Sequence, residues 1–123
     1  MSLSNGDRKD QSIDEVFIEN SPLESTGGKI WPASRLFEDF LHSIFSLDST
    51  KPFRVLELGS GCGWLGLRLA RKYKHWEVIM SEQGSFGALD WLNHNISLNP
   101  SISVNSVELD WAELPANLDP FDL

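Results

Sequence analysis

The segment with the clearest chemical meaning is Val55-Leu56-Glu57-Leu58-Gly59-Ser60-Gly61-Cys62-Gly63, in which an apolar run precedes alternating glycines. Glycine adopts backbone conformations that other residues avoid, and it lets a ligand approach the main chain closely. Sheets that bind nucleotides carry such a loop where a strand ends and a helix begins. The segment therefore predicts a ligand-binding loop formed by Gly59, Ser60, Gly61 and Gly63.

The acid inside the end of the predicted strand, Glu57, indicates what kind of ligand the loop binds. A carboxylate attracts a cation and repels a pyrophosphate. S-adenosylmethionine carries an ammonium and a sulfonium, so Glu57 favours this methyl donor. Gly61-Cys62-Gly63-Trp64-Leu65-Gly66 also fits the dinucleotide pattern G-x-G-x-x-G, but it begins two residues too late after a strand that ends at Leu58. A dinucleotide site and a tight turn without ligand are the alternatives.

Further candidate ligand contacts follow the next two predicted strands. Glu82 could accept hydrogen bonds from both hydroxyls of a ribose. Asp110 could accept a hydrogen bond from the adenine amino group, and the indole of Trp111 could stack on the purine. The simpler alternatives are a surface carboxylate at Glu82 and a core side chain at Trp111.

Alternating helices and strands must position these residues. Apolar spacing predicts helices at 33–46, 64–74 and 86–98, and strands at 53–58, 76–80 and 102–109, the last with a bulge at Asn105-Ser106. This order predicts a parallel α/β sheet with strand order 3-2-1-4-5, in which Phe121-Asp122-Leu123 opens the fourth strand. In the first helix, the predicted core face is Leu36, Phe37, Phe40, Leu41, Ile44 and Phe45, and the other face is Arg35, Glu38, Asp39 and His42.

Length and charge limit the classes of protein. The chain has 123 residues, which suits one small domain, and a net charge of −8. All Lys and Arg lie between Arg8 and Lys74, so the acidic C-terminal part argues against a nucleic-acid partner. The acidic C-terminal part could form a surface that binds a basic protein partner, or it could simply keep the protein in solution. The polar N-terminus is no signal peptide and no apolar run spans a bilayer, so we expect a cytoplasmic or nuclear protein without membrane contact.

Four segments resemble the family-16 methyltransferases, seven-strand enzymes that mostly methylate lysines of proteins. They are Thr26 to Ser34, Val55 to Gly63, Asn95 to Asn99 and Val107 to Trp111, and the likeness covers residues 16–123. The resemblance implies a Rossmann-like class I methyltransferase fold, S-adenosyl-L-methionine as cofactor and a protein-lysine substrate. It implies cofactor contacts from Trp31, Gly59 to Gly61, Glu82 and Trp111. Most relatives have Asp where Glu82 stands, and their spacing from there to the Asn95 motif is shorter.

The resemblance also implies a division of the chain. Residues 1–12 are expected to be a disordered tail, and residues 13–123 the N-terminal half of the methyltransferase sheet. In the family, an acidic motif and an aromatic residue that shape the acceptor site follow the fourth strand, so we predict no catalytic residue and no metal ligand. We expect a truncated form with low or no activity. A non-catalytic fragment that binds cofactor or a partner, and a dinucleotide oxidoreductase fragment, are the alternatives.

Overall fold

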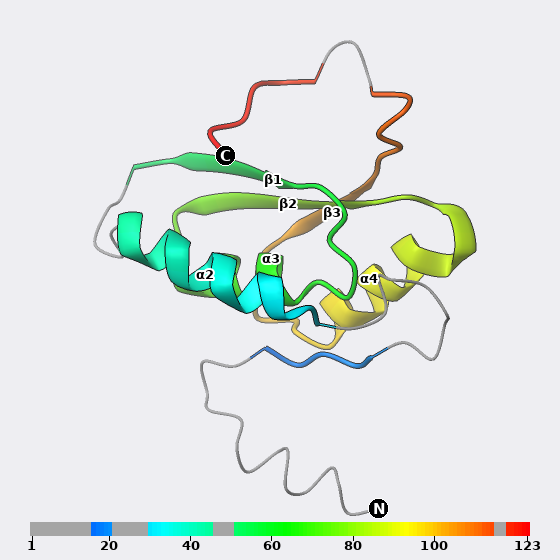
Figure 1. Ribbon diagram of the computed structural model, residues 1–123, viewed down its shortest axis with the longest axis horizontal. Coiled ribbons are helices and arrows are strands. Elements are labelled where there is room, and N and C mark those ends of the chain that lie inside the picture. Colours follow the sequence, from blue (N-terminus) through cyan, green and yellow to red (C-terminus); the bar gives the residue numbers. More distant parts are fainter. Residues whose placement is uncertain (1–15, 21–29, 46–50, 115–117) are drawn as a thin grey trace, which may run out of the picture.

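The computed structural model describes residues 16–20, 30–45, 51–114 and 118–123. The predicted tail at residues 1–12 lies outside these ranges. Helices and strands alternate along the chain as predicted (Figure 1). In order, they are helix α2 (Pro32–Ile44), strand β1 (Phe53–Glu57), helix α3 (Trp64–Lys72), strand β2 (Trp76–Glu82), the 3-10 turn η2 (Ser85–Gly87), helix α4 (Ala88–Ser97) and strand β3 (Asn105–Glu108). None of the helices in the described ranges is long and apolar enough to cross a bilayer.

The strands form a parallel sheet in the order β1-β2-β3, with Val55 beside Val78 and Ile79 beside Asn105. The last residues of the chain pair with the other edge of β1. Leu123 N–H donates to Arg54 O at 3.2 Å, and Leu56 N–H donates to Leu123 O at 2.9 Å. A residue that bonds to both neighbours of its partner is paired in the parallel manner. The sheet therefore continues past β1 with the segment predicted to open the fourth strand.

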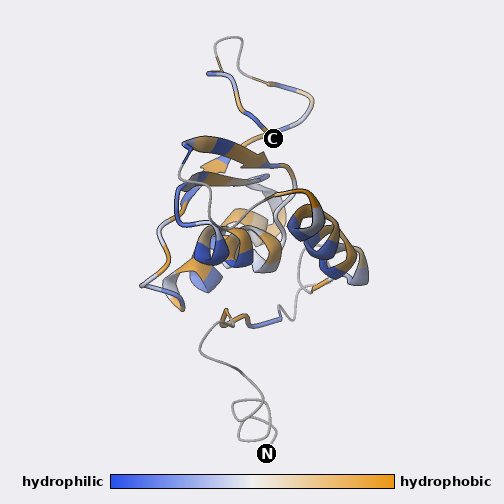
Figure 2. Ribbon diagram, turned by 90° about the vertical axis from the view of Figure 1, so that its left-hand side faces the viewer, coloured by the Kyte–Doolittle hydropathy of each residue, from blue (hydrophilic) through white to orange (hydrophobic). Residues whose placement is uncertain are grey.

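All three α-helices pack on one face of the sheet, and two perpendicular views agree on this arrangement (Figures 1 and 2). The strand residues that point toward the helices, Val55, Val78 and Met80, belong to the buried core. On the opposite face, Arg54 of β1 pairs with Glu77 of β2 at 3.1 Å. The sequence alternation along the strands produces these two faces because neighbouring side chains point to opposite sides of a sheet.

A cluster of aromatic rings closes the core at the end of the sheet where β1 and β2 begin. The Tyr73 and Trp76 rings stack with centroids 4.1 Å apart. Phe45 and Phe53 meet edge to face at 5.1 Å, and Phe45 meets Trp76 in the same way at 5.1 Å. This cluster ties the ends of α2 and α3 to the strands. The carboxyl ends of the strands, at the other end of the sheet, are left for the glycine loop.

The predicted core face of α2 is wrong for most of its residues. Leu41 is buried and Phe45 is partly buried, whereas Leu36 is 71% exposed and Phe40 is 56% exposed. Glu38, predicted on the outer face, is buried because its carboxylate pairs with Arg68 of α3. The helix thus contacts α3 through this ion pair as well as through apolar side chains. Phe37 and Ile44 are also exposed.

Two other predictions need correction. The bulge predicted at Asn105-Ser106 does not occur, because β3 starts at Asn105 and pairs with β2 without interruption. The helix predicted at 86–98 is divided into η2 and α4, since Phe86 and Gly87 have φ of 57° and 75°. A left-handed residue cannot continue an α-helix, so α4 begins only at Ala88.

Candidate functional site

The glycine loop follows β1 and leads into α3, as the sequence predicts. Gly59, Gly61 and Gly63 have φ of 63°, 58° and 92°. This left-handed backbone turns the chain sharply between strand and helix. At Gly59 a side chain would also meet a neighbour, because a Cβ atom there would lie 3.2 Å from Cζ2 of Trp111. Glycine therefore lets the Trp111 indole lie directly against the loop.

Hydrogen bonds from β2 and α4 hold the loop in place. Ser60 N–H donates to Ser81 O at 2.9 Å, and Gly61 N–H donates to Glu82 Oε2 at 2.9 Å. From the opposite side, Asn95 Nδ2 donates to Cys62 O at 2.9 Å. Successive residues of the loop are thus fixed by different elements, which orients its backbone before any ligand arrives.

The loop forms one wall of a pocket of about 400 Å³. The predicted site residues that line it are Trp31, Glu57, Gly59, Ser60, Gly61, Glu82, Asp110 and Trp111. They come from α2 and from the ends of all three strands. Residues far apart in the sequence therefore meet where a parallel sheet of this type binds nucleotides.

Gly63 is the one predicted site residue that does not line the pocket. It is the N-cap of α3, and a Cβ atom there would lie 2.9 Å from Cδ1 of Leu92 in α4. Gly66 has a similar role, since its Cβ would collide with the Met80 side chain and lie 2.9 Å from Glu57 Oε1. Both glycines therefore serve close packing against neighbouring elements.

The charge of the pocket is acidic. Glu57, Glu82 and Asp110 line it, and no Lys or Arg is found among its lining residues within the described ranges. Burial raises the pKa of Glu57 from 4.5 to about 7, and the Glu82 carboxylate adds to this rise. The side chain of Ser60 and the backbone of Gly66 lower the same pKa. Among the described residues, none gives the Oε1 atom of Glu57 a well-aligned hydrogen bond. A cation placed beside Glu57 would stabilise its charged form.

Glu82 and Asp110 are both held by the backbone around them. Glu82 Oε2 accepts from Gly61 N–H and Oε1 accepts from Gln83 N–H, both at 2.9 Å. Asp110 Oδ1 accepts from Ala112 N–H at 2.9 Å. A carboxylate oxygen has two lone pairs, so each of these acids can accept a further hydrogen bond from a ligand. Both are therefore oriented acceptors.

Exposed aromatic side chains surround the pocket. Trp31 is 46% exposed, Trp111 is 66% exposed and Phe86 is 82% exposed. Phe86 was not predicted as a site residue. The sequence does carry one sign that Phe86 is special, because it lies between Gly84 and Gly87 in a segment predicted to be helical. Other lining residues outside the prediction are Ile30, Ser34, Cys62, Trp64, Leu65, Gln83, Ala88 and Leu109.

Cys62 lies in the loop but is not a reactive thiol. It is buried, and burial raises its pKa above the ordinary value. Because the thiolate is the nucleophilic form, Cys62 stays protonated and inert at neutral pH. Its part in the site is its carbonyl oxygen, which Asn95 binds.

The parallel sheet, the glycine loop after β1 and the acid at the end of β2 define a Rossmann-like methyltransferase fold. The sequence pattern of a family described as lysine methyltransferase matches residues 10–123, and the chain belongs to this family. A UPF0665 family protein of Schizosaccharomyces pombe is 29% identical over 108 residues, which are 85% of this chain. The chain spans 32% of that relative's length.

Proposed function

We propose that this chain is the cofactor-binding part of an S-adenosylmethionine-dependent methyltransferase that acts on a lysine of a protein substrate. The observation that carries the proposal is the acidic pocket beside the glycine loop, which the partly buried Glu57 lines. A ligand with an ammonium and a sulfonium is attracted to such a pocket. The two phosphates of a dinucleotide would meet Glu57 and Glu82 without a compensating Lys or Arg among the described lining residues.

The residues of the pocket suit the parts of this cofactor. Glu57 provides a negative charge for its cationic end. Glu82, already oriented by Gly61 N–H, accepts hydrogen bonds from the ribose hydroxyls. Asp110 accepts from the adenine amino group, and the exposed face of Trp111 offers a surface for stacking. Trp31, the N-cap of α2, lines the same pocket.

In this proposal the chain binds and orients the cofactor, and it contributes no acid or base to the reaction. The cofactor supplies an electrophilic methyl group, which the neutral amine of lysine accepts in a displacement that depends mainly on in-line placement. The lysine preference rests on the description of the family. We propose the cytoplasm or the nucleus as its location, where a chain with a single cysteine is at no disadvantage.

Titration calorimetry with S-adenosylmethionine, S-adenosylhomocysteine and NAD tests the proposal. We expect both sulfur ligands to bind more tightly than NAD. The variant Glu113→Gln is a matched control, because it removes one exposed charge that does not line the pocket. Its affinities should equal those of the wild type. Tighter binding of NAD than of S-adenosylhomocysteine would overturn the assignment in favour of a dinucleotide site.

A second experiment separates an active enzyme from a binding fragment. The chain is incubated with a cell lysate and a cofactor labelled in its methyl group, and labelled proteins are separated on a gel. We expect the 123-residue chain to bind the labelled cofactor, and a gel without bands that depend on the chain would assign it binding alone. Labelled bands that depend on the chain would instead assign transferase activity to it directly, and mass spectrometry would then identify the modified side chain.

A further inference from the structure

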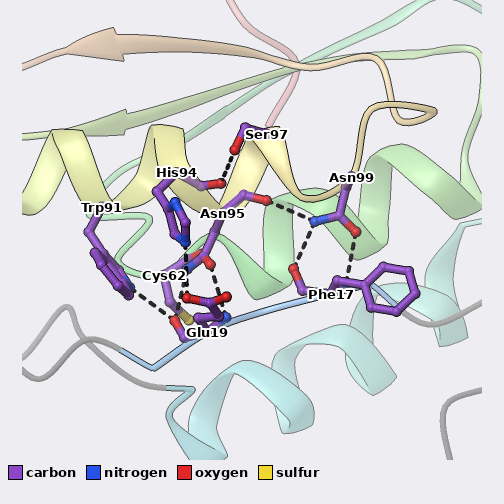
Figure 3. A network of polar contacts seen from close by, with 8 residues as sticks. All are labelled: Phe17, Glu19, Cys62, Trp91, His94, Asn95, Ser97 and Asn99. Atoms are coloured by element: carbon purple, nitrogen blue, oxygen red, sulfur yellow. Dashed lines mark hydrogen bonds and ion pairs between the residues drawn. The ribbon is translucent and has the colours of Figure 1, made fainter. Parts of the chain in front are cut away.

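An extended segment near the N-terminus lies against α4, far from it in the sequence. This segment, residues 16–20, is here called the N-terminal strap (Figure 3). The amide side chain of Asn99 bonds to both backbone polar groups of Phe17. Phe17 N–H donates to Asn99 Oδ1 at 2.7 Å, and Asn99 Nδ2 donates to Phe17 O at 2.8 Å. Asn95 binds the backbone of Glu19 in the same way, at 2.9 and 3.1 Å. Each asparagine side chain thus acts as the neighbouring strand of a sheet would.

The spacing of the two asparagines explains why this pairing fits. Four residues along a helix rise by about 6 Å, and two residues along an extended chain advance by about 6.6 Å. Asn95, in the last turn of α4, therefore matches Glu19, and Asn99, just beyond the end of α4, matches Phe17. The strap runs opposite to α4. Val16 and Ile18, the alternate residues of the strap, pack into the core. The strap is held by its backbone and by these apolar side chains.

Asn95 differs from Asn99 because one of its hydrogen bonds reaches the glycine loop. Its Nδ2 also donates to Cys62 O at 2.9 Å, within the glycine loop. The Asn95 side chain is completely buried and bonds to the strap and to the loop at the same time. The amide has two N–H donors, and both are in use. If the strap leaves, Asn95 loses the groups that fix its orientation toward the loop.

We propose that docking of the N-terminal strap and binding of the ligand at the glycine loop favour each other, with Asn95 as the positioning residue between them. This inference rests on the proposed function, because it takes the glycine loop to be the cofactor site. The strap itself does not line the pocket. Coupling between two sites is reciprocal, so the ligand must stabilise the docked strap by the same factor by which the strap improves ligand binding.

A pair of substitutions at one strap residue tests the coupling in the full chain. Glu19→Pro removes the N–H that Asn95 Oδ1 accepts, whereas Glu19→Ala keeps that N–H and removes only the exposed contact with His94. We expect Glu19→Pro to weaken S-adenosylhomocysteine binding about five- to tenfold, within the usual range of coupling. Glu19→Ala should change it less than about twofold, because surface ion pairs contribute little.

Substitutions of the two asparagines provide the second arm of the test. Asn95→Ala removes the contact with Cys62 O, and Asn99→Ala removes only the contacts with Phe17 and with the carbonyl of Asn95. We expect Asn95→Ala to lower affinity more than Asn99→Ala does, and Glu19→Pro to add little in the Asn95→Ala background. Circular dichroism and thermal melting establish that each variant is folded. Equal affinity losses in the two asparagine variants would contradict the special role of Asn95.

Hydrogen exchange reports the reverse direction of the coupling. The amides of Phe17 and Glu19 should exchange about five- to tenfold more slowly when S-adenosylhomocysteine is bound. A strap with a merely structural role would lower the melting temperature in Glu19→Pro but leave ligand affinity and ligand-dependent exchange unchanged, and that result would overturn the inference. If the wild-type chain binds no S-adenosylhomocysteine, the proposed function fails first. Binding by the wild type with no effect of Glu19→Pro refutes the coupling alone.

Discussion

Gly61 N–H donates a hydrogen bond of 2.9 Å to the carboxylate of Glu82, so the acid at the end of β2 holds the glycine loop that follows β1. The same carboxylate lines the pocket. One side chain thus has two tasks, because it fixes the shape of the loop and presents an acceptor to the ligand. Replacing it therefore changes the site in two ways.

The variant Glu82→Ala should bind S-adenosylhomocysteine about 10- to 150-fold more weakly. Hydrogen bonds to an ionised acceptor contribute about 1.5–3 kcal/mol each, and the freed Gly61 N–H adds to the loss. Calorimetry at constant pH measures the change. Glu113→Ala is the control, since Glu113 is exposed and outside the pocket. An unchanged affinity in Glu82→Ala would show that Glu82 is only a surface charge.

The variant Glu57→Gln should be more stable than the wild type at pH 8 and close to it at pH 5. The pKa of Glu57 is raised from 4.5 to about 7 in the folded chain. Its contribution to stability is therefore fully present below the unfolded pKa and is lost as the pH rises through about 7. A shift of this size corresponds to roughly 3 kcal/mol at high pH. Gln carries no charge at either pH.

Thermal melting of both proteins between pH 5 and pH 8 measures this effect. The wild type should lose stability across the range, and Glu57→Gln should lose less. The same variant should bind S-adenosylmethionine more weakly at pH 8, because the cation loses its partner carboxylate. An identical pH dependence in the two proteins would mean that the Glu57 carboxylate titrates as an ordinary exposed acid.

The variant Phe86→Asn should keep its stability and lose ligand affinity. Phe86 is 82% exposed and has φ of 57°, a conformation that Asn adopts more readily than Phe. We expect the free energy of unfolding to stay within about 0.5 kcal/mol of the wild type. Affinity for S-adenosylhomocysteine should fall several-fold, because an aromatic wall of the pocket is removed. A loss of 3 kcal/mol or so in urea denaturation, typical of a core Phe, would contradict this reading.

The variant Gly66→Ala should be less stable than the wild type by roughly 1–3 kcal/mol. Alanine is the better helix former by about 1 kcal/mol, so helix propensity alone would make the variant more stable than the wild type. The Cβ of Ala would collide with Met80 of β2, and α3 would have to move away from the sheet. Denaturant unfolding measures the difference. A gain in stability would show that α3 tolerates the methyl group without moving.

The sequence predicts those parts of the fold that depend on local pattern. The glycine loop, its place between β1 and α3, and the parallel order of the strands follow from spacing along the chain. Glu57 and Glu82 could be predicted as site residues because acids at the carboxyl ends of parallel strands meet at one edge of the sheet. The sequence could not show that Gly63, unlike the other glycines of the loop, serves packing and not ligand binding, since this role depends on Leu92 of α4.

Features that depend on distant partners were missed. Helical spacing identified an apolar face on α2, but burial of Glu38 depends on Arg68, which lies 30 residues away. The helix predicted at 86–98 includes Phe86, because the neighbouring Gly84 and Gly87 do not by themselves show that Phe86 is left-handed. In the sequence, Asn95 and Asn99 stand out only as the two ends of the Asn95 to Asn99 motif. Their spacing of four residues, in a residue type that disfavours helices, was a physical signal that their side chains bind backbone.

The N-terminal strap also sets an order of events during synthesis. Phe17 and its partner Asn99 are 82 residues apart, so the strap leaves the ribosome well before its binding groups exist. At about 5–20 residues per second, this interval lasts roughly 4–16 seconds. Val16 and Ile18 remain without their core contacts during that time, and the glycine loop lacks the Asn95 anchor. The ligand site is therefore completed only when Asn95 in α4 has been made, 76 residues after its strap partner Glu19.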